Sequence, residues 1–354
     1  MKLLKHSMKA RILFLLASCA ALLISTPLTG VYAQKSKNET HSVMRWEHSD
    51  DGLKRRMEVR GKVEFNEEYT DVVSVSEGGW VIIEEHRDSQ SYRYEVRRDL
   101  AGNLTRAFFV NGAARSFDPT TRAWLAKIVL DAIRQSTIDV EKRVQRILAK
   151  SGVAGVLAEI SQITGDYGKR HYYQELIKQA NLDGAGLRDV LRQVAGHITS
   201  DYEQAQLLIA VAPMLTGKDA AIQPFFDAVA TIKSDYEHSR VLKTLVKEGT
   251  PSSAVLVLAA SSTKSISSDY ERRGVLTVVA RAKNQSEELL RLLLDSAAEF
   301  TSDYEKATFL IEVSNVYTGD TRLRSAFLKA VETIKSDYER GRVLSTLLKN
   351  KQIS

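Results

Sequence analysis

Six copies of an Asp-Tyr pair, spaced almost evenly, constrain the fold of this chain more than any other feature. The pairs begin at Asp166, Asp201, Asp235, Asp269, Asp303 and Asp337, so the first step along the chain is 35 and each later step is 34. Five of them lie within the tetrapeptide Ser-Asp-Tyr-Glu. A period of about 20–50 residues is typical of stacked supersecondary units, so the C-terminal part of the chain is predicted to be a solenoid.

The residues between the pairs repeat a helical pattern. Positions six, seven, ten and eleven after the Asp are apolar, as in Val241, Leu242, Leu245 and Val246, and these positions share one stripe of a helix. A second apolar segment follows and ends three positions before the next Asp. The residues at that position are Ile163, Ile198, Ile232, Ile266, Phe300 and Ile334. Each unit is therefore predicted to be a helical hairpin that buries its apolar faces by stacking.

Residues 137–354 are predicted to hold about seven such hairpins. A diverged first unit is expected at 138–141, and the polar segment 349–351 is expected to cap a final half-unit. The units have tetratricopeptide length, but the Trp, Gly, Ala and closing Pro of that pattern are absent. We expect an α-solenoid similar in kind to TPR and HEAT arrays, outside either family.

Residues 42–118 alternate apolar and charged side chains with a period of two. Met57 and Val59 form one such run, and Tyr94 and Val96 form another. This pattern is typical of antiparallel strands with one polar face, and turn signals such as Asp51-Gly52 separate the runs. The segment is therefore predicted to be an antiparallel β-meander of five or six strands.

A helix over 119–136 is predicted to cover this sheet, because strands this short need a partner surface. Pro119 suits the first turn of such a helix. The chain as a whole is thus expected to be α+β and mainly α, with a small antiparallel β-module followed by an α-solenoid.

Residues 1–33 resemble a secretory signal peptide. Four cations near the start of the chain precede an apolar run over 12–24, and Val31-Tyr32-Ala33 gives a cleavage site before Gln34. The alternative is a retained anchor over 12–29, although the apolar run is short for a membrane span of about 20 residues. The polar segment 34–41 is predicted to be a linker.

The N-terminal pattern limits the expected cellular location of the chain and its expected binding partners. The predicted destination is the periplasm or the extracellular space, with no membrane association once the signal is cleaved. Cys19 is the only cysteine, so the mature chain would carry no disulfide. Without the four cations of the signal, the formal charge of +6 falls to +2, and nucleic acid is not an expected partner.

The Ser and Glu of the repeated motif have the spacing of a capping box. In that arrangement the Ser hydroxyl accepts from the third backbone amide, and the Glu carboxylate bonds back to the Ser N–H. The Asp suits the positive end of the helix dipole. The predicted structural caps are Ser200 with Glu203, Ser234 with Glu237, Ser268 with Glu271, Ser302 with Glu305, and Ser336 with Glu339. The first unit has Gly165 and Gly168 in these places, so its helix start is expected to be weaker.

The Tyr of the motif has two interpretations. It lies about 150° from the centre of the apolar stripe at 100° per residue, so each ring either folds over the apolar residue at the repeat junction or stands in an exposed ladder. The candidate ladder is Tyr167, Tyr202, Tyr236, Tyr270, Tyr304 and Tyr338, flanked by Arg240 and Arg342. Such a ladder would suit an extended peptide or a glycan strand.

The chain shows no sequence pattern for chemistry. It has no His-Glu-x-x-His, no Gly-rich phosphate loop, no Gly-x-Ser-x-Gly and no Cys/His spacing for a metal. Glu84-Glu85-His86 on a strand is better explained as a solvated face than as a metal site. No catalytic, cofactor-binding or metal-binding residue is predicted, and the chain is not expected to be an enzyme.

One combination of features resembles a known arrangement. A strand-rich module with Gly61-Lys62-Val63-Glu64-Phe65 and Ser76-Glu77-Gly78-Gly79 precedes the Ser-Asp-Tyr-Glu repeats. This resembles the extracytoplasmic region appended to some bacterial beta-lactam-sensor-type membrane metallopeptidases, over about 42–354. The His-Glu-x-x-His peptidase domain of those proteins is absent here. The resemblance implies a sensing or interaction module of a bacterial cell envelope and implies no peptidase activity.

The sequence therefore favours an exported bacterial envelope protein that acts as a non-enzymatic scaffold and binds a protein or peptide through its helical-repeat surface. One alternative is a glycan or cell-wall binding module that uses the Tyr and Arg rows. Another is a sensory module of an envelope signalling system.

Overall fold

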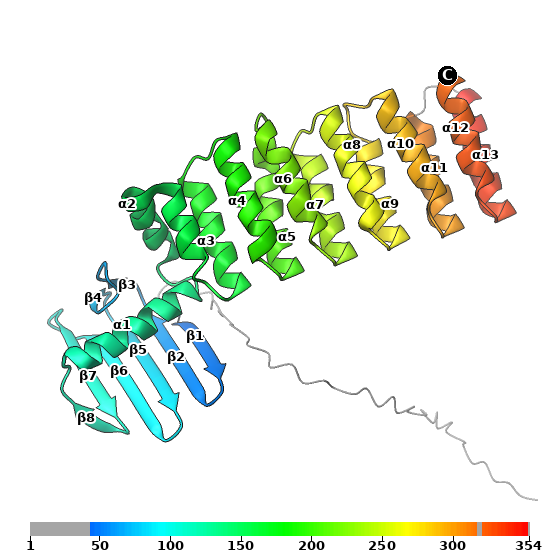
Figure 1. Ribbon diagram of the computed structural model, residues 1–354. Coiled ribbons are helices and arrows are strands. Elements are labelled where there is room, and N and C mark those ends of the chain that lie inside the picture. The colour runs from blue at the N-terminus through cyan, green and yellow to red at the C-terminus, as the bar shows by residue number, and fades with distance from the viewer. Residues whose placement is uncertain (1–42, 317–320, 353–354) are drawn as a thin grey trace, which may run out of the picture.

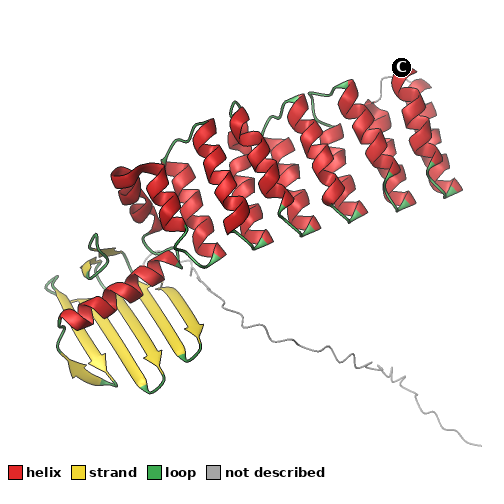
Figure 2. Cartoon of the chain, viewed as in Figure 1, coloured by secondary structure: helices red, strands yellow, loops and turns green. Residues whose placement is uncertain are grey.

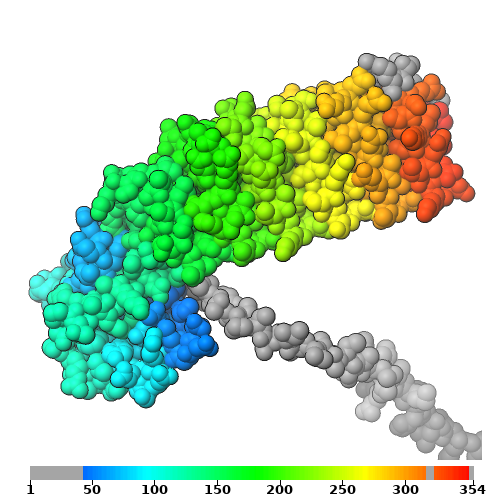
Figure 3. All heavy atoms as spheres, in the orientation of Figure 1, coloured from blue at the N-terminus to red at the C-terminus, as the bar shows by residue number. Residues whose placement is uncertain are grey.

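The computed structural model describes residues 43–316 and 321–352, and these form an elongated molecule with a small β-module at one end of a helical array (Figures 1 and 3). The C-terminus lies at the opposite end of the array. The predicted signal peptide 1–33, the anchor segment 12–29 and the linker 34–41 lie outside the described residues. The predicted class, α+β and mainly α, is confirmed.

The β-module is an antiparallel meander. Its strands are β1 (Val43–Asp50), β2 (Leu53–Arg60), β3 (Val63–Phe65), β4 (Val72–Val75), β5 (Trp80–Arg87), β6 (Gln90–Arg98), β7 (Leu104–Val110) and β8 (Ala113–Arg115). Six of them form one sheet in the order β1-β2-β5-β6-β7-β8. The other two, β3 and β4, form a separate hairpin between β2 and β5. The predicted meander is thus present, with this hairpin as an addition.

Two glycines allow that hairpin to leave the sheet. Gly61 has a φ of +80°, a conformation that side chains rarely adopt. A Cβ on Gly79 would lie 2.7 Å from the carbonyl oxygen of Arg60, so this close approach of two backbones requires glycine. The chain therefore exits after β2 and returns to begin β5 within a tight space.

One face of the sheet is covered by helix α1 (Pro119–Arg134), which crosses the strands in Figure 2. Asp118 caps this helix and accepts a hydrogen bond from the Thr121 N–H at 2.9 Å. The helix buries Leu125 and Ile128 against side chains such as Trp46 and Tyr94. Burial of a large apolar side chain contributes about 1.5–3 kcal/mol. The other face of the sheet carries ion pairs, so the predicted division into an apolar and a polar face is observed.

The helices that follow form two layers. They are α2 (Val140–Ile160), α3 (Asp166–Gln179), α4 (Gly184–His197), α5 (Asp201–Val211), α6 (Asp219–Ala230), α7 (Asp235–Glu248), α8 (Ser253–Ser262), α9 (Asp269–Ala280), α10 (Glu287–Ala298), α11 (Asp303–Val316), α12 (Thr321–Glu332) and α13 (Asp337–Gln352). The odd-numbered helices from α3 to α13 pack side by side as one layer, and the even-numbered helices from α4 to α12 form the second. Within the described residues this gives five two-helix hairpins after α2 and a final single helix.

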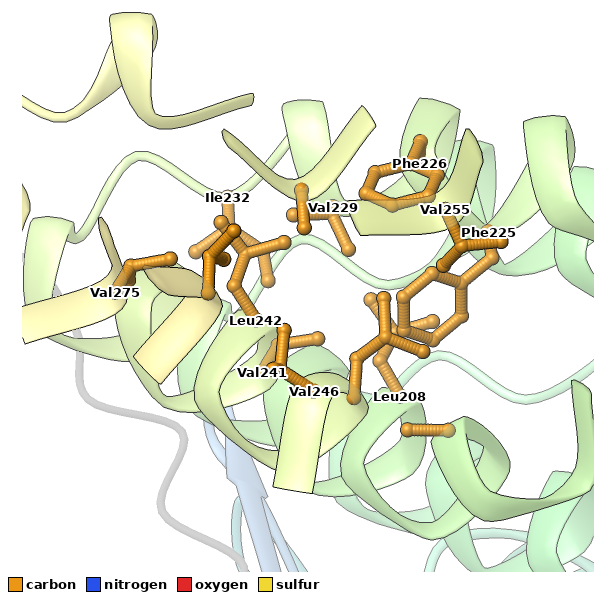
Figure 4. Packing of buried hydrophobic residues seen from close by; sticks show 14 of the residues in the cluster. Leu208, Phe225, Phe226, Val229, Ile232, Val241, Leu242, Val246, Val255 and Val275 are labelled. Atoms are coloured by element: carbon orange, nitrogen blue, oxygen red, sulfur yellow. The ribbon is translucent and has the colours of Figure 1, made fainter. Parts of the chain in front are cut away.

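The predicted apolar stripe is the core of the array. Figure 4 shows Val241 and Leu242 of α7 meeting Phe225 and Val229 of α6, with Val275 of the next unit alongside. All five side chains are completely buried. The apolar residues three positions before each Asp are buried too. The hydrophobic contacts therefore run from unit to unit as one continuous cluster.

The diverged first unit is α2. Gly152 inside it has φ 63° and ψ −165°, a backbone conformation that interrupts the helix and folds it into two parts. This makes a compact hairpin that joins the array through α3.

Hydrogen bonds connect the β3–β4 hairpin to the start of α2, and the end of α1 to the start of α3. Tyr69 donates its hydroxyl to Asp139 at 2.9 Å, and both residues have a φ of 57°. Lys142 bonds Glu64 at 2.5 Å. Gln135, at the end of α1, accepts the Gly165 N–H at 2.9 Å. The module thus contacts both the first hairpin and the start of α3.

The last described helix does not behave as the predicted cap. In the preceding units, positions seven and eleven after the Asp are buried by the next unit, as for Leu242 and Val246. In α13 the corresponding Leu344 and Leu348 are exposed. Two positions of the apolar stripe are therefore left uncovered at the last described helix.

Candidate functional site

The Ser of each motif starts a helix as predicted. Its hydroxyl oxygen accepts a hydrogen bond from the backbone N–H of the Glu three residues later, at 3.3–3.4 Å. In the first unit Gly165 occupies this place and makes no side-chain cap bond. The five pairs are Ser200 with Glu203, Ser234 with Glu237, Ser268 with Glu271, Ser302 with Glu305, and Ser336 with Glu339.

The returning half of the predicted capping box is replaced by a bond between units. The N–H of each motif Ser donates to the Asp carboxylate of the preceding unit at 2.7–2.8 Å. The N–H of the residue before each Ser donates to the same carboxylate, at 2.8–3.2 Å. We call this pair of contacts the inter-repeat aspartate bond. It connects Asp166, Asp201, Asp235, Asp269 and Asp303 to Ser200, Ser234, Ser268, Ser302 and Ser336, respectively.

This bond corrects the predicted role of the Glu. Since the Ser N–H is already donated to an Asp, the Glu carboxylate is engaged elsewhere. Glu271 accepts from Lys243 of the preceding unit at 2.9 Å, and Glu237 pairs with Arg240 of its own helix at 2.5 Å. The other pairs are Arg170 with Glu203, Arg273 with Glu305, and Arg342 with Glu339. The charges of Arg240 and Arg342 are therefore already matched by carboxylates.

Hydrogen bonds from backbone N–H groups lower the pKa of one of these Asp carboxyls. The Ser336 N–H, and less strongly the Lys335 N–H, lower the pKa of Asp303 because both stabilise its carboxylate. The carboxylate therefore stays charged down to a lower pH than an ordinary Asp.

The tyrosines are exposed in five of the six units. The interpretation that each ring folds over the apolar residue at the junction is wrong for these five, whose exposed fractions run from 53% to 74%. We call them the tyrosine row: Tyr202, Tyr236, Tyr270, Tyr304 and Tyr338. The sixth, Tyr167, is half-buried and makes an edge contact with His171 at 4.5 Å between ring centroids.

The row lies along one edge of the array. Each Tyr is the second residue of its helix. In Figure 1 α13 runs from the lower edge up to the marked C-terminus, and its layer of helices starts along that lower edge. Because the aspartate bonds fix the start of each helix against the preceding one, the rings are held at equivalent positions.

Guanidinium groups stack on several of the rings. The Arg Cζ lies 5.7 Å from the ring centroid for Arg240 over Tyr236, and 5.6 Å for Arg342 over Tyr304. Arg273 over Tyr270 and Arg170 over Tyr167 are both at 5.4 Å. Such contacts contribute about 0.5–1 kcal/mol at exposed sites. Arg170 and Arg273, which lie four residues after the Asp instead of five, were not among the predicted site residues.

A polar residue three positions after the Asp, buried in four of the six units, was also missed. Gln204 donates to the Ala228 carbonyl at 2.9 Å, and Lys306 donates to the Thr333 carbonyl at 3.2 Å. His238 contacts the Ser262 hydroxyl at 2.9 Å. These contacts bind the end of the second helix of the unit. The sequence feature that could have revealed these residues is a recurrent polar position one turn before the apolar stripe. Their role is structural.

Two hollows lie away from the tyrosine row. One of about 570 Å³ is lined by Glu67, Tyr69, Arg143, Arg146 and their neighbours. Burial, and then the nearby Asp139 carboxylate, raise the pKa of Tyr69 to about 12. Tyr69 of the β-module donates to Asp139 and accepts from Arg146, and these two bonds hold the β-module on α2. A second hollow of about 300 Å³ lies on the outer face of the sheet.

The described residues, 43–316 and 321–352, hold neither a metal-binding cluster nor a membrane-spanning helix. No group of three His, Cys, Asp or Glu side chains in these ranges is arranged to hold a metal ion. Glu84 bonds Arg93 and Glu85 bonds Arg55, so the two carboxylates point to opposite faces of the sheet. None of the described helices combines the length and apolarity that a bilayer span requires.

Comparisons with protein-family models, with curated proteins and with solved structures found no match for this chain. Its function is therefore inferred from its own residues and their geometry.

The aspartate bond predicts unequal effects of three substitutions. Asp235→Ala removes the acceptor of two backbone N–H groups and should lower the free energy of unfolding by about 1–3 kcal/mol. Ser234→Ala removes one cap and should cost about 1 kcal/mol. Asp337→Ala is the matched control, since Asp337 begins the last described helix and its side chain is 97% exposed. Urea denaturation followed by circular dichroism measures all three, and equal losses for Asp235→Ala and Asp337→Ala would contradict this role.

Two histidines with lowered pKa values, the half-buried His171 and the buried His238, predict a loss of stability in mild acid. Burial, and then the charge of Arg170, lower the pKa of His171 to about 4, and burial lowers the pKa of His238. An unfolded chain protonates these rings near pH 6.5, so it binds more protons than the folded chain as the pH falls from about 6.5 toward 4. Stability present above pH 6.5 is therefore lost across this window.

The measurement is the urea midpoint at pH 7.5 and at pH 5.0. The double variant His171→Gln/His238→Gln should lose less stability between these two pH values than the parent chain, whatever its stability at pH 7.5. An equal loss in the two proteins would show that other groups cause the acid sensitivity.

Proposed function

We propose that this chain is a non-enzymatic scaffold of a bacterial cell envelope that binds a protein or peptide through its tyrosine row. The observation that carries the proposal is the exposure of five rings at one position of successive packed helices. Isolated exposed apolar residues are ordinary, whereas a regular row of large rings is typical of a binding surface. Tyr and Arg are also the residue types that most often dominate binding energy.

The rigidity of the array supports this function. Each ring extends from a helix whose start is fixed by a Ser cap and an inter-repeat aspartate bond. Binding therefore requires little ordering of the backbone, which is a major cost in association. A stacked guanidinium further restricts rings such as Tyr236 and Tyr270.

Location in the envelope is the second part of the proposal. Residues 1–33 have the pattern of a secretory signal, and the resemblance to extracytoplasmic regions of sensor-type metallopeptidases agrees with it. Export places the row in the periplasm or outside the cell, where the partner would be an envelope protein or an exported peptide.

Site-specific photo-crosslinking tests the binding surface. A benzoylphenylalanine placed at Tyr236 or at Tyr270 in the producing cell should form an adduct with an envelope protein, because both positions face the bound partner. The same residue at Leu328, which is exposed on the other helical layer, is the matched control and should form none.

The same experiment checks whether adduct formation depends on the other rings of the tyrosine row. Adducts from Tyr236 should weaken at least fivefold when Tyr202, Tyr270 and Tyr304 are changed to Ala. Adducts that are absent at both row positions, or equal at Leu328, would exclude the row as the binding surface.

A further inference from the structure

The spacing of the tyrosine row selects one kind of ligand backbone. Packed helices lie about 8–10 Å apart, and α5, α7, α9, α11 and α13 pack side by side in one layer. Equivalent rings on successive helices therefore recur at about that interval. A polyproline II helix has three residues per turn and a rise of about 3.1 Å, so its residues on one face recur about every 9.3 Å. In an extended strand they recur about every 6.6–6.8 Å.

The carboxylates of the motif beside the row already have hydrogen-bond partners. The Asp carboxylates accept backbone N–H groups of the next unit, and the motif Glu carboxylates accept from Arg, Lys or Ser side chains. The phenol hydroxyls of the row can donate as well as accept, whereas guanidinium groups such as that of Arg273, which also pairs with Glu305, have donors only. A ligand rich in acceptors complements both kinds of group.

Proline supplies that chemistry. A proline residue keeps its carbonyl acceptor and has no backbone N–H, and a polyproline II segment makes no internal hydrogen bonds, so its carbonyls remain available. Its rings also pack against aromatic side chains, which is how other Pro-rich segments are recognised. The guanidinium covers one face of rings such as Tyr270, which leaves the other face and the hydroxyl edge for the ligand.

We propose that the tyrosine row binds a proline-rich segment in the polyproline II conformation, lying along the motif edge with about one turn per repeat. This inference rests on the proposed function and names its ligand class. Five rings at about 9 Å intervals match a segment of about 12–15 residues. The segment is already extended before it binds, so it loses little conformational freedom.

The test is a titration of the full chain with capped oligoproline peptides of two, three, four and five turns, followed by isothermal calorimetry. The dissociation constant should fall at least threefold with each added turn up to four turns, because each turn reaches another ring. A Gly-Ser peptide as long as the five-turn oligoproline, which has an N–H at every position, should bind at least tenfold more weakly. Affinity that is independent of length would overturn the proposal.

Substitutions in the tyrosine row test whether the oligoproline peptide binds there. The triple variant Tyr236→Ala, Tyr270→Ala and Tyr304→Ala should weaken binding of the four-turn peptide at least tenfold. The triple Tyr→Phe variant at the same positions keeps the rings, loses the hydroxyl donors and should be intermediate. Leu328→Ala, on the other layer, should bind like the parent chain. Unchanged binding by the triple Ala variant, with its helical circular dichroism intact, would overturn the proposal.

The same titration with chitin oligosaccharides and peptidoglycan fragments distinguishes a glycan ligand from a proline-rich one. Glycans present donors and acceptors together and should bind at least tenfold more weakly than oligoproline. Tyr-dependent glycan binding without oligoproline binding would overturn the polyproline ligand. If oligoproline fails while row-dependent crosslinks from Tyr236 persist, the ligand class is wrong and the protein-binding function stands. If both fail, both proposals fall.

Discussion

The bond between an Asp carboxylate and the backbone of the next unit is the contact on which the rest of the array depends. Two consecutive N–H groups at each linker would otherwise have no partner in the helix that they precede, and a bond to a charged group contributes about 1.5–3 kcal/mol. The apolar stripe makes neighbouring units adhere, but hydrophobic burial is not directional. The carboxylate adds direction, because it accepts the Ser268 N–H only when one helix start stands beside the next.

This bond divides the four residues of the motif by role. Ser caps its own helix, Asp binds the following unit, and Glu pairs with a cation such as Lys243 or Arg240. All three contribute to folding. The Tyr is left to face solvent in five units, whereas Tyr167, beside the β-module, is half-buried against His171. A short motif thus builds a rigid array and displays one aromatic ring per unit.

The sequence predicted the local features best. The stripe around Leu242 and the Ser caps follow from helical periodicity and from the short spacing between Ser and Glu. The aspartate bond was missed because donor and acceptor lie 33 residues apart, and the helix dipole already gave the Asp a sufficient local role. The helical angle placed Tyr236 away from the core, but whether it folded over Ile232 depended on where Arg240 lies. That arginine stacks on the ring, a tertiary contact that no spacing rule specifies.

Amide hydrogen exchange at the linker between α8 and α9 tests the central claim most directly. In the parent chain the N–H groups of Ser267 and Ser268 should be protected, because both donate to Asp235. In an Asp235→Ala variant, which has no side-chain acceptor, they should exchange at least tenfold faster, while Thr301 and Ser302, which donate to Asp269, keep their protection. Equal exchange of Ser267 and Ser268 in the two proteins would contradict the account.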